Sequence, residues 1–181
     1  MNKMTFTETA LKGAFIIEPK LILDERGFFA STWSQKEFAD RGLGAPVVQA
    51  NVSLNKRRGT LRGMHFQINP HQEVKLVRCT AGSILDVIVD LREDSPSFHQ
   101  WVGVELSVGN RLMLYVPAGC AHGYQTLADN TEVAYQISEY YHPESARGVR
   151  WDDPAFGIDW PLPVTIMSER DRNHPFLAEL R

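Results

Sequence analysis

Hydrophobic and polar residues alternate along most of the chain after Pro46. In the segment 83–92, aliphatic residues occupy the odd positions from 85 to 91, whereas Asp86, Asp90 and Arg92 occupy even positions. The same alternation recurs in the segments 101–107, 111–116 and 132–138. A period of two is typical of β-strands, because successive side chains of a strand point to opposite faces. These segments are therefore predicted to be short strands.

The first part of the chain has shorter runs. The apolar runs 14–17 and 21–23 are broken by Pro19, which indicates strands at a sheet edge. The aromatic and β-branched segment 28–33 is predicted to be another strand. The segment Ser34–Arg41 begins with the capping-box pattern of a serine followed three residues later by Glu37, so it predicts one short helix.

Many short strands without alternating helices predict an all-β sandwich or barrel. No internal repeat or linker divides the chain, so residues 1–181 are expected to form a single domain. The tail from Trp151 is rich in proline and tryptophan and is expected to wrap over the barrel. Ser168–Asp171 within it has the pattern of a single helical turn.

Composition and charge narrow the possible partners. The chain has 181 residues, 43% of them hydrophobic, and a formal net charge of −3, which gives no reason to expect nucleic acid or an acidic membrane as a partner. The basic cluster Lys56–Arg58 suits either a small phosphorylated ligand or a solvated loop. Cys79 and Cys120 lack disulfide spacing, and no signal peptide or transmembrane run is evident. We therefore expect a cytoplasmic protein.

The segment Gly59–Gln67 combines a strand-like pattern with an unusual density of charge. His65 has a neighbour in Arg62, and Lys75 follows in the next predicted strand. Histidine is the natural general base near neutral pH, although a lone histidine is more often a satisfied core residue. Burying these cations without a ligand or partner would be costly. Tyr135 reads from periodicity as a core tyrosine.

A second cluster, Pro117–Gly123, has the spacing P-x-G-x-x-H, which resembles the second motif of cupins, the small jelly-roll barrels. Metal-binding cupins add two histidines from an earlier strand, where this chain has only His65 followed by Gln67. Two histidines, His65 and His122, without an evident third ligand form a poor zinc or iron site. The sequence therefore favours no metal, with Gln67 as the remaining alternative ligand.

Taken together, seven motifs resemble the dTDP-4-dehydrorhamnose 3,5-epimerase family, from about Asp24 to Asp171. They are Leu61–Gln67, Lys75–Arg78, Asp86–Arg92, Ser95–Phe98, Trp101–Val104, Pro117–Tyr124 and Trp151–Pro154. The resemblance implies a cupin-type jelly-roll β-barrel with a few short peripheral helices and neither metal nor cofactor. It also implies a homodimer and an isomerase of deoxysugar biosynthesis that acts on a nucleotide-diphospho-sugar.

The implied reaction inverts C3, C5 or both in a nucleotide-linked 4-keto-6-deoxyhexose. The resemblance makes His65 the base, oriented by Asp171, and Tyr135 the acid on the opposite face of the sugar. Lys75 would stabilise the enolate oxygen. The implied substrate-binding residues are Arg62, His122, Arg26, Phe28, Gln49, Asn51 and Tyr141, with Arg26 acting in its own subunit or across a dimer interface.

Three positions depart from the family pattern. The family usually carries carboxylates where this chain has Ser31, Ala50 and Ala146. A carboxylate can accept the N3–H of thymine, whereas serine both donates and accepts, so the base preference is expected to relax or to switch to CDP first and GDP second. The alternatives are a sugar 3,4-ketoisomerase, which needs no acid in the place of Tyr135, and a non-catalytic binding protein.

Overall fold

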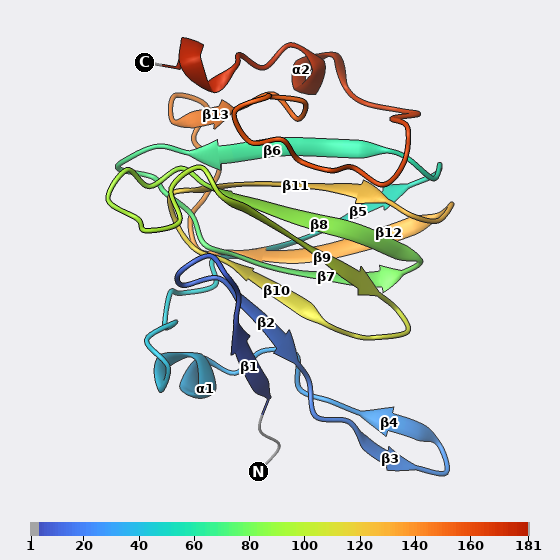
Figure 1. The fold of residues 1–181 in the computed structure, drawn as a ribbon. Helices are drawn as coiled ribbons and strands as arrows, with labels where there is room; N and C mark the ends of the chain where they lie inside the picture. The colour runs from blue at the N-terminus through green and yellow to red at the C-terminus, as the bar shows by residue number, and fades with distance from the viewer. Residues whose placement is uncertain (1–3, 181) are drawn as a thin grey trace.

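The structure is a computed structural model that describes residues 4–180. Two antiparallel sheets face each other, and Figure 1 shows the C-terminal tail crossing above them and a small hairpin projecting below. The first sheet has the strand order β1 (Thr5–Glu8), β2 (Phe15–Glu18), β10 (Met113–Val116), β7 (Lys75–Ala81), β12 (Thr131–Ile137) and β5 (Gln49–Asn55). The second has the order β13 (Ala146–Gly148), β6 (Leu61–Gln67), β11 (Cys120–Thr126), β8 (Ser83–Asp90) and β9 (Trp101–Ser107).

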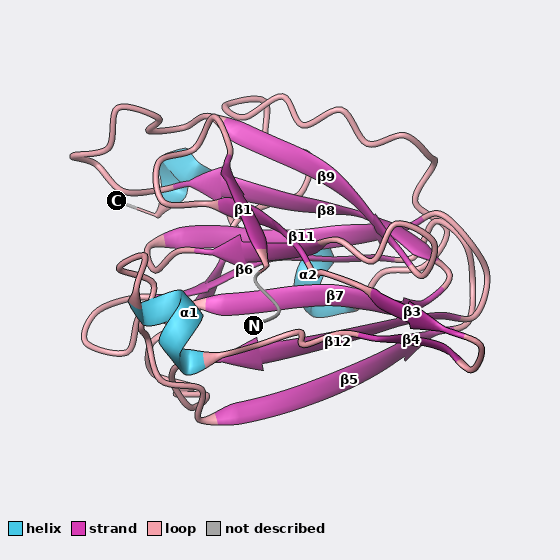
Figure 2. Cartoon of the chain, turned by 90° about the horizontal axis from the view of Figure 1, so that it is seen from below, coloured by secondary structure: helices cyan, strands magenta, loops and turns pink. Residues whose placement is uncertain are grey.

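These facing sheets form a jelly-roll barrel, so the all-β prediction is confirmed. The remaining elements are the hairpin strands β3 (Ile22–Asp24) and β4 (Gly27–Phe29), the helices α1 (Gln35–Ala39) and α2 (Glu169–Arg172), and a 3₁₀ helix at Leu177–Glu179. Figure 2 shows α1 beside the ends of the strands and α2 behind the sheets in this view. The main core fills the space between the sheets and includes Ile88, Leu106, Leu114 and Val133.

Strand β8 alternates as predicted, but neither of its faces meets solvent. Ile84 and Ile88 point between the sheets, in the same direction as the even-numbered Asp86. Val87 and Val89 point outward, where the C-terminal tail covers them. The alternation therefore separates two buried environments.

Asp90 at the end of β8 organises the following loop. Its carboxylate is fully buried and accepts hydrogen bonds from Arg92 Nε at 2.8 Å, Arg92 Nη2 at 2.7 Å and Ser97 Oγ at 2.7 Å. Burial alone would raise the pKa of Asp90, but the hydrogen bonds from Arg92, Ser95 and Ser97 outweigh it and hold this pKa well below its usual value. The loop thus depends on an ionised carboxylate.

We expect Asp90→Ala to lower the free energy of unfolding at pH 7 by about 3 kcal/mol, because Arg92 and both serines lose their acceptor. A carboxylate whose pKa is lower in the folded than in the unfolded chain stabilises the fold at pH values above its unfolded pKa, about 3.9 for Asp. This stabilisation is lost as the pH falls toward the pKa in the folded chain. The difference between wild type and variant should therefore shrink below about pH 4. Urea denaturation at several pH values measures it, with the exposed Asp94→Ala as control; equal stability of the two variants at pH 7 would contradict the assignment.

The N-terminal predictions need correction at three points. The segment 28–33 was expected to be one strand, but only its start belongs to β4, which pairs with β3 in a separate hairpin. Strand β2 is one position in from the sheet edge, because β1 pairs outside it. In the predicted helix, Ser34 accepts from the Glu37 amide, but the Glu37 carboxylate accepts from the Met4 amide at 2.9 Å, so half of the capping box forms.

The C-terminal tail wraps over the outer face of the second sheet, as expected. Phe156, Ile158 and Trp160 pack against Val87 and Val89 of β8. Ser168 caps the single turn of α2 by accepting a hydrogen bond from the Asp171 amide at 3.1 Å. The tail thereby holds Asp171 above strand β6.

Burial protects both cysteine thiols. Cys79 and Cys120 are free, and burial raises their pKa values to about 11 and about 12, so both stay protonated at neutral pH. Within residues 4–180, no helix has the length and apolar character needed to span a bilayer.

Candidate active site

Two adjoining hollows open between the sheets and share His65, Lys75 and Tyr135. The inner one has a volume of about 150 Å³ and the outer one about 310 Å³. The inner hollow is also lined by Ser53, Arg62, His122, Gly123 and Tyr124. The outer hollow is also lined by Gln49, Asn51, Phe66, Gln67, Glu73, Ile137, Tyr141, Ala146, Arg147 and Arg170. The structure thus brings most of the sequence-predicted site residues to one cavity.

The three shared residues come from opposite walls. His65 belongs to β6 in the five-stranded sheet, whereas Lys75 on β7 and Tyr135 on β12 belong to the six-stranded sheet. Because β7 and β12 are paired with Lys75 opposite Ile137, Lys75 and Tyr135 lie on neighbouring strands of the same wall. A ligand in the cavity therefore has His65 on one side and both Tyr135 and Lys75 on the other.

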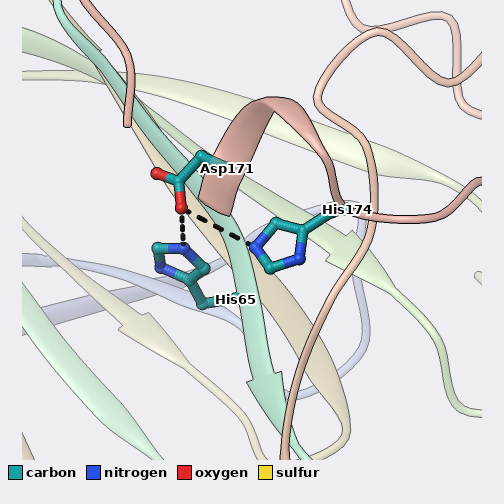
Figure 3. A group of neighbouring side chains, drawn as sticks. All are labelled: His65, Asp171 and His174. Atoms are coloured by element: carbon teal, nitrogen blue, oxygen red, sulfur yellow. Dashed lines mark hydrogen bonds and ion pairs between the residues drawn. The ribbon is translucent and has the colours of Figure 1, made fainter. Parts of the chain in front are cut away.

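His65 is held by Asp171 from behind. His65 Nε2 lies 2.8 Å from Asp171 Oδ1 (Figure 3). The Gly63 amide donates to Asp171 Oδ2 at 3.2 Å. Burial tends to raise the pKa of Asp171, but the hydrogen bond and charge of His65 and the Gly63 amide lower it overall. The ionised carboxylate accepts the Nε2 proton, which leaves Nδ1 of neutral His65 as the basic nitrogen.

His174 is a neighbour of Asp171 that no sequence pattern predicted. Its Nε2 lies 3.7 Å from Asp171 Oδ1, and its ring packs edge-on against that of His65 with the centroids 5.5 Å apart. The ring lies directly against Gly148, where any β-carbon would collide with it. Burial lowers the pKa of His174, and the charges of His65 and Arg170 lower it further, so it is neutral at neutral pH.

The other polar residues of the cavity are paired. Lys75 Nζ lies 3.0 Å from Glu73 Oε1, with both side chains largely buried. His122 Nε2 lies 2.7 Å from Oδ1 of the fully buried Asp86. Arg62 Nε donates to Asn55 Oδ1 at 2.8 Å. Asp86 lies within one of the sequence motifs. Glu73 and Asn55 were not predicted as site residues, because no local sequence pattern relates them to the site.

Tyr135 keeps its proton at neutral pH. Burial raises its pKa, the charge of Arg62 partly offsets this, and Glu73 raises it again. A protonated phenol on the wall opposite His65 can act as a proton donor.

The alternative metal ligand Gln67 is already engaged. Its Nε2 donates to the carbonyl oxygens of His71 and Tyr140, both at 3.0 Å, and its Oε1 accepts from the His142 amide at 2.7 Å. His65 and His122 are directed at separate carboxylates. These residues do not fit the metal site of a metal-binding cupin.

Two predicted site residues lie elsewhere in this chain. Arg26 and Phe28 sit on the β3–β4 hairpin and line neither hollow. The Arg26 guanidinium pairs with Asp24 at 2.6 Å and its side chain is 85% exposed, while Phe28 packs beneath Arg111 at 4.2 Å. Arg26 therefore reaches neither hollow of its own subunit.

Two of the three departures from the family pattern line hollows. Ala146 lines the outer hollow, and Ala50 lines an adjacent smaller one together with Thr32 and Arg78. Ser31 lines none of these three hollows.

Comparisons with known proteins agree with this geometry. A dTDP-4-dehydrorhamnose 3,5-epimerase of Methanothermobacter thermautotrophicus is 47% identical to this chain, and the match covers 99% of this chain and 97% of the relative. The crystal structure of dTDP-4-dehydrorhamnose 3,5-epimerase from Bacillus anthracis with TDP and pyrophosphate bound is 44% identical, covers 96% of this chain and 99% of its own, and has a TM-score of 0.93.

The crystal structure of dTDP-6-deoxy-D-glucose-3,5-epimerase from Legionella pneumophila in complex with dTDP-4-keto-L-rhamnose is 39% identical. It covers 98% of this chain and 95% of its own, with a TM-score of 0.92. The family model described as dTDP-4-dehydrorhamnose 3,5-epimerase matches residues 8–179. This chain belongs to the dTDP-4-dehydrorhamnose 3,5-epimerase family.

Proposed function

We propose that this chain inverts C3 and C5 of a dTDP-linked 4-keto-6-deoxyhexose, with His65 as the base and Tyr135 as the acid. The observation that carries the assignment is the placement of the two residues on opposite walls of one cavity, with Asp171 behind His65. Inversion requires removal of a proton from one face of the sugar and its return to the other. A base and an acid on facing sheets meet that requirement.

Proton removal begins at His65. The C4 ketone acidifies the hydrogens at C3 and C5, and the unprotonated Nδ1 of His65 takes one of them. The resulting imidazolium remains bonded through Nε2 to Asp171, 2.8 Å away, which stabilises its positive charge. Asp171 thereby fixes the direction of the His65 ring.

The enolate is stabilised and reprotonated from the opposite wall. The ammonium group of Lys75 stabilises the negative charge on the enolate oxygen. Glu73, 3.0 Å from Lys75 Nζ, holds this group in place. Tyr135 retains its proton at neutral pH because burial raises its pKa, so it can deliver that proton to the far face of the planar carbon. The two residues share one wall, which lets both act on the same enolate.

The outer hollow has the features that a nucleoside diphosphate requires. Arg147 and Arg170 supply positive charge for phosphate, Tyr141 supplies an aromatic face for the base, and Gln49 and Asn51 supply amides for hydrogen bonding. The bound TDP in the Bacillus anthracis relative and the dTDP-sugar in the Legionella pneumophila relative support thymine as the base.

Titration with dTDP, CDP, UDP and GDP tests the base preference. If the amides and Tyr141 read thymine, we expect dTDP to bind at least about 10-fold more tightly than the others, a difference of 1.4 kcal/mol. Isothermal titration calorimetry gives the four constants. Tighter binding of CDP or GDP would instead show that Ser31, Ala50 and Ala146 have changed the base preference.

The exposed hairpin supports a homodimer. Leu23 on β3 is 75% exposed and Phe29 on β4 is 65% exposed, although both are apolar. An apolar surface of this kind is typical of a protein–protein contact. A second copy of the chain would cover it and would bring Arg26 and Phe28 toward a neighbouring cavity.

The double variant Leu23→Asp and Phe29→Asp is expected to convert a dimer to a monomer, because the charges would be buried without partners at the contact. Sedimentation velocity measures the change, and the exposed Leu54→Asp on β5 serves as a matched control. An unchanged dimer in the hairpin variant would place the contact elsewhere.

Solvent exchange tests the reaction itself. Wild-type protein incubated in D₂O with a dTDP-linked 4-keto-6-deoxyglucose should incorporate deuterium at C3 and at C5, as read by ¹H NMR. Incorporation at C3 alone would make the protein a single epimerase, and a product with its ketone at C3 would make it a ketoisomerase. Absence of exchange in folded protein would overturn the proposal.

A further inference from the structure

Asp171 stands between two histidines. The ligand atoms of His65, Asp171 and His174 all lie within 4.8 Å of one another. Asp171 Oδ1 is 2.8 Å from His65 Nε2 and 3.7 Å from His174 Nε2 (Figure 3). Two imidazoles and one carboxylate are a donor set that Zn²⁺ binds in proteins, with bonds of about 2.0–2.2 Å and a fourth position left open.

The His174 nitrogen lacks a hydrogen-bond partner among the described residues. Its side chain is 9% exposed, and Nε2 is buried without a partner although it faces Asp171. A buried polar atom of this kind calls for an explanation such as a bound ion. Gly148 provides the space for the ring, and the Gly63 amide holds the Asp171 carboxylate, so both donors are fixed in place.

We propose that His65, Asp171 and His174 form a binding site for Zn²⁺ and that the bound ion inhibits the enzyme. This site differs from that of the metal-binding cupins, which would use the positions of His65, Gln67 and His122. The separations of 2.8 Å and 3.7 Å from Asp171 Oδ1 to the two Nε2 atoms lie on either side of the spacing of about 3.3 Å that tetrahedral zinc imposes between its ligand atoms. The inhibition rests on the proposed role of His65, whereas the binding does not.

Inhibition follows from the tautomer of His65. An imidazole nitrogen must lose its proton before it binds a metal. Zn²⁺ at Nε2 therefore requires the other neutral tautomer of His65: the proton that Asp171 accepts leaves Nε2, and a proton from solvent occupies Nδ1, so the ring remains neutral. Nδ1 is the nitrogen that takes the proton from the sugar, so the metal-bound ring has no basic lone pair. The ion thus removes the base without entering the space of the sugar.

The site is expected to select transition metals. Imidazole ligands favour Zn²⁺ over Mg²⁺ and Ca²⁺, which prefer oxygen ligands. The neutral form of His174, which burial favours, is the form that binds a metal.

Zn²⁺ titration of protein freed of metal by EDTA tests the site. Calorimetry should show one ion bound, and ¹⁵N NMR should show shifts of the Nε2 signals of His65 and His174. Deuterium exchange into the substrate should fall at least about 10-fold with Zn²⁺ and recover on addition of EDTA, while Mg²⁺ has no effect. No Zn²⁺ binding, or shifts confined to other histidines, would overturn the proposal.

His174→Phe keeps a ring of similar shape but removes the ligand atom. Zn²⁺ affinity should fall at least about 10-fold, and inhibition should disappear at concentrations that inhibit the wild type. The matched control is His142→Leu, because His71, His142 and Glu144 form the second such group, on the surface. Inhibition that survives in His174→Phe and vanishes in His142→Leu would place the ion at the surface group. If His174→Phe fails to fold, the NMR shifts in wild type decide alone.

Discussion

His65→Ala is expected to abolish deuterium incorporation into the sugar and to lower kcat/KM by about 10³-fold or more, the upper range for a general base. The variant keeps Asp171, Lys75 and Tyr135 but has no group that removes a proton from C3 or C5. Because His65 is half-buried at the edge of the cavity, its loss leaves the main core intact. ¹H NMR of the substrate in D₂O measures the exchange at both carbons.

The control for this variant is His71→Ala, which removes a histidine outside the two hollows. It should exchange at the wild-type rate. Binding of dTDP by His65→Ala should also stay close to wild type, which separates lost chemistry from lost folding. Undiminished exchange in His65→Ala would remove His65 from the role of base.

Tyr135→Phe is expected to separate proton removal from inversion. The ring remains to pack against the core, but the hydroxyl that would protonate the far face is absent. His65 can still remove a proton and return deuterium from the same face, so exchange with retention should continue. Formation of inverted product should fall by about 10²- to 10⁴-fold. NMR of one reaction mixture gives both the deuterium content and the proportion of inverted sugar.

Tyr140→Phe makes the same chemical change on a tyrosine that is 56% exposed and lies outside both hollows. It should invert the sugar normally. Normal inversion by Tyr135→Phe as well would assign the acid to another group.

Sequence periodicity predicted the strands well because alternation is a local property. It could not tell which face of β8 meets solvent, since the tail that covers Val87 and Val89 lies far along the chain. It also extended one strand through 28–33, although only Phe28 and Phe29 belong to the hairpin and Trp33 packs against a core cluster. Propensity alone cannot distinguish an aromatic residue in a core from one on an exposed surface.

The site was predictable to different degrees. His65 and Lys75 stood out because charged residues in a strand need an explanation. Asp171 came only from the family resemblance, because no local pattern relates it to His65. His174 gave no signal at all, since its importance comes from the space above Gly148 and from the position of Asp171.

The hydrogen bond between His65 and Asp171 joins residues 106 positions apart. Synthesis of the chain therefore completes both sheets before the carboxylate that orients the base appears. A molecule whose barrel has formed but whose tail has not docked would retain Lys75 and Tyr135 on the opposite wall and would lack the carboxylate that orients His65. Catalytic activity is therefore expected to depend on docking of the tail, because release of the tail would remove the carboxylate behind His65.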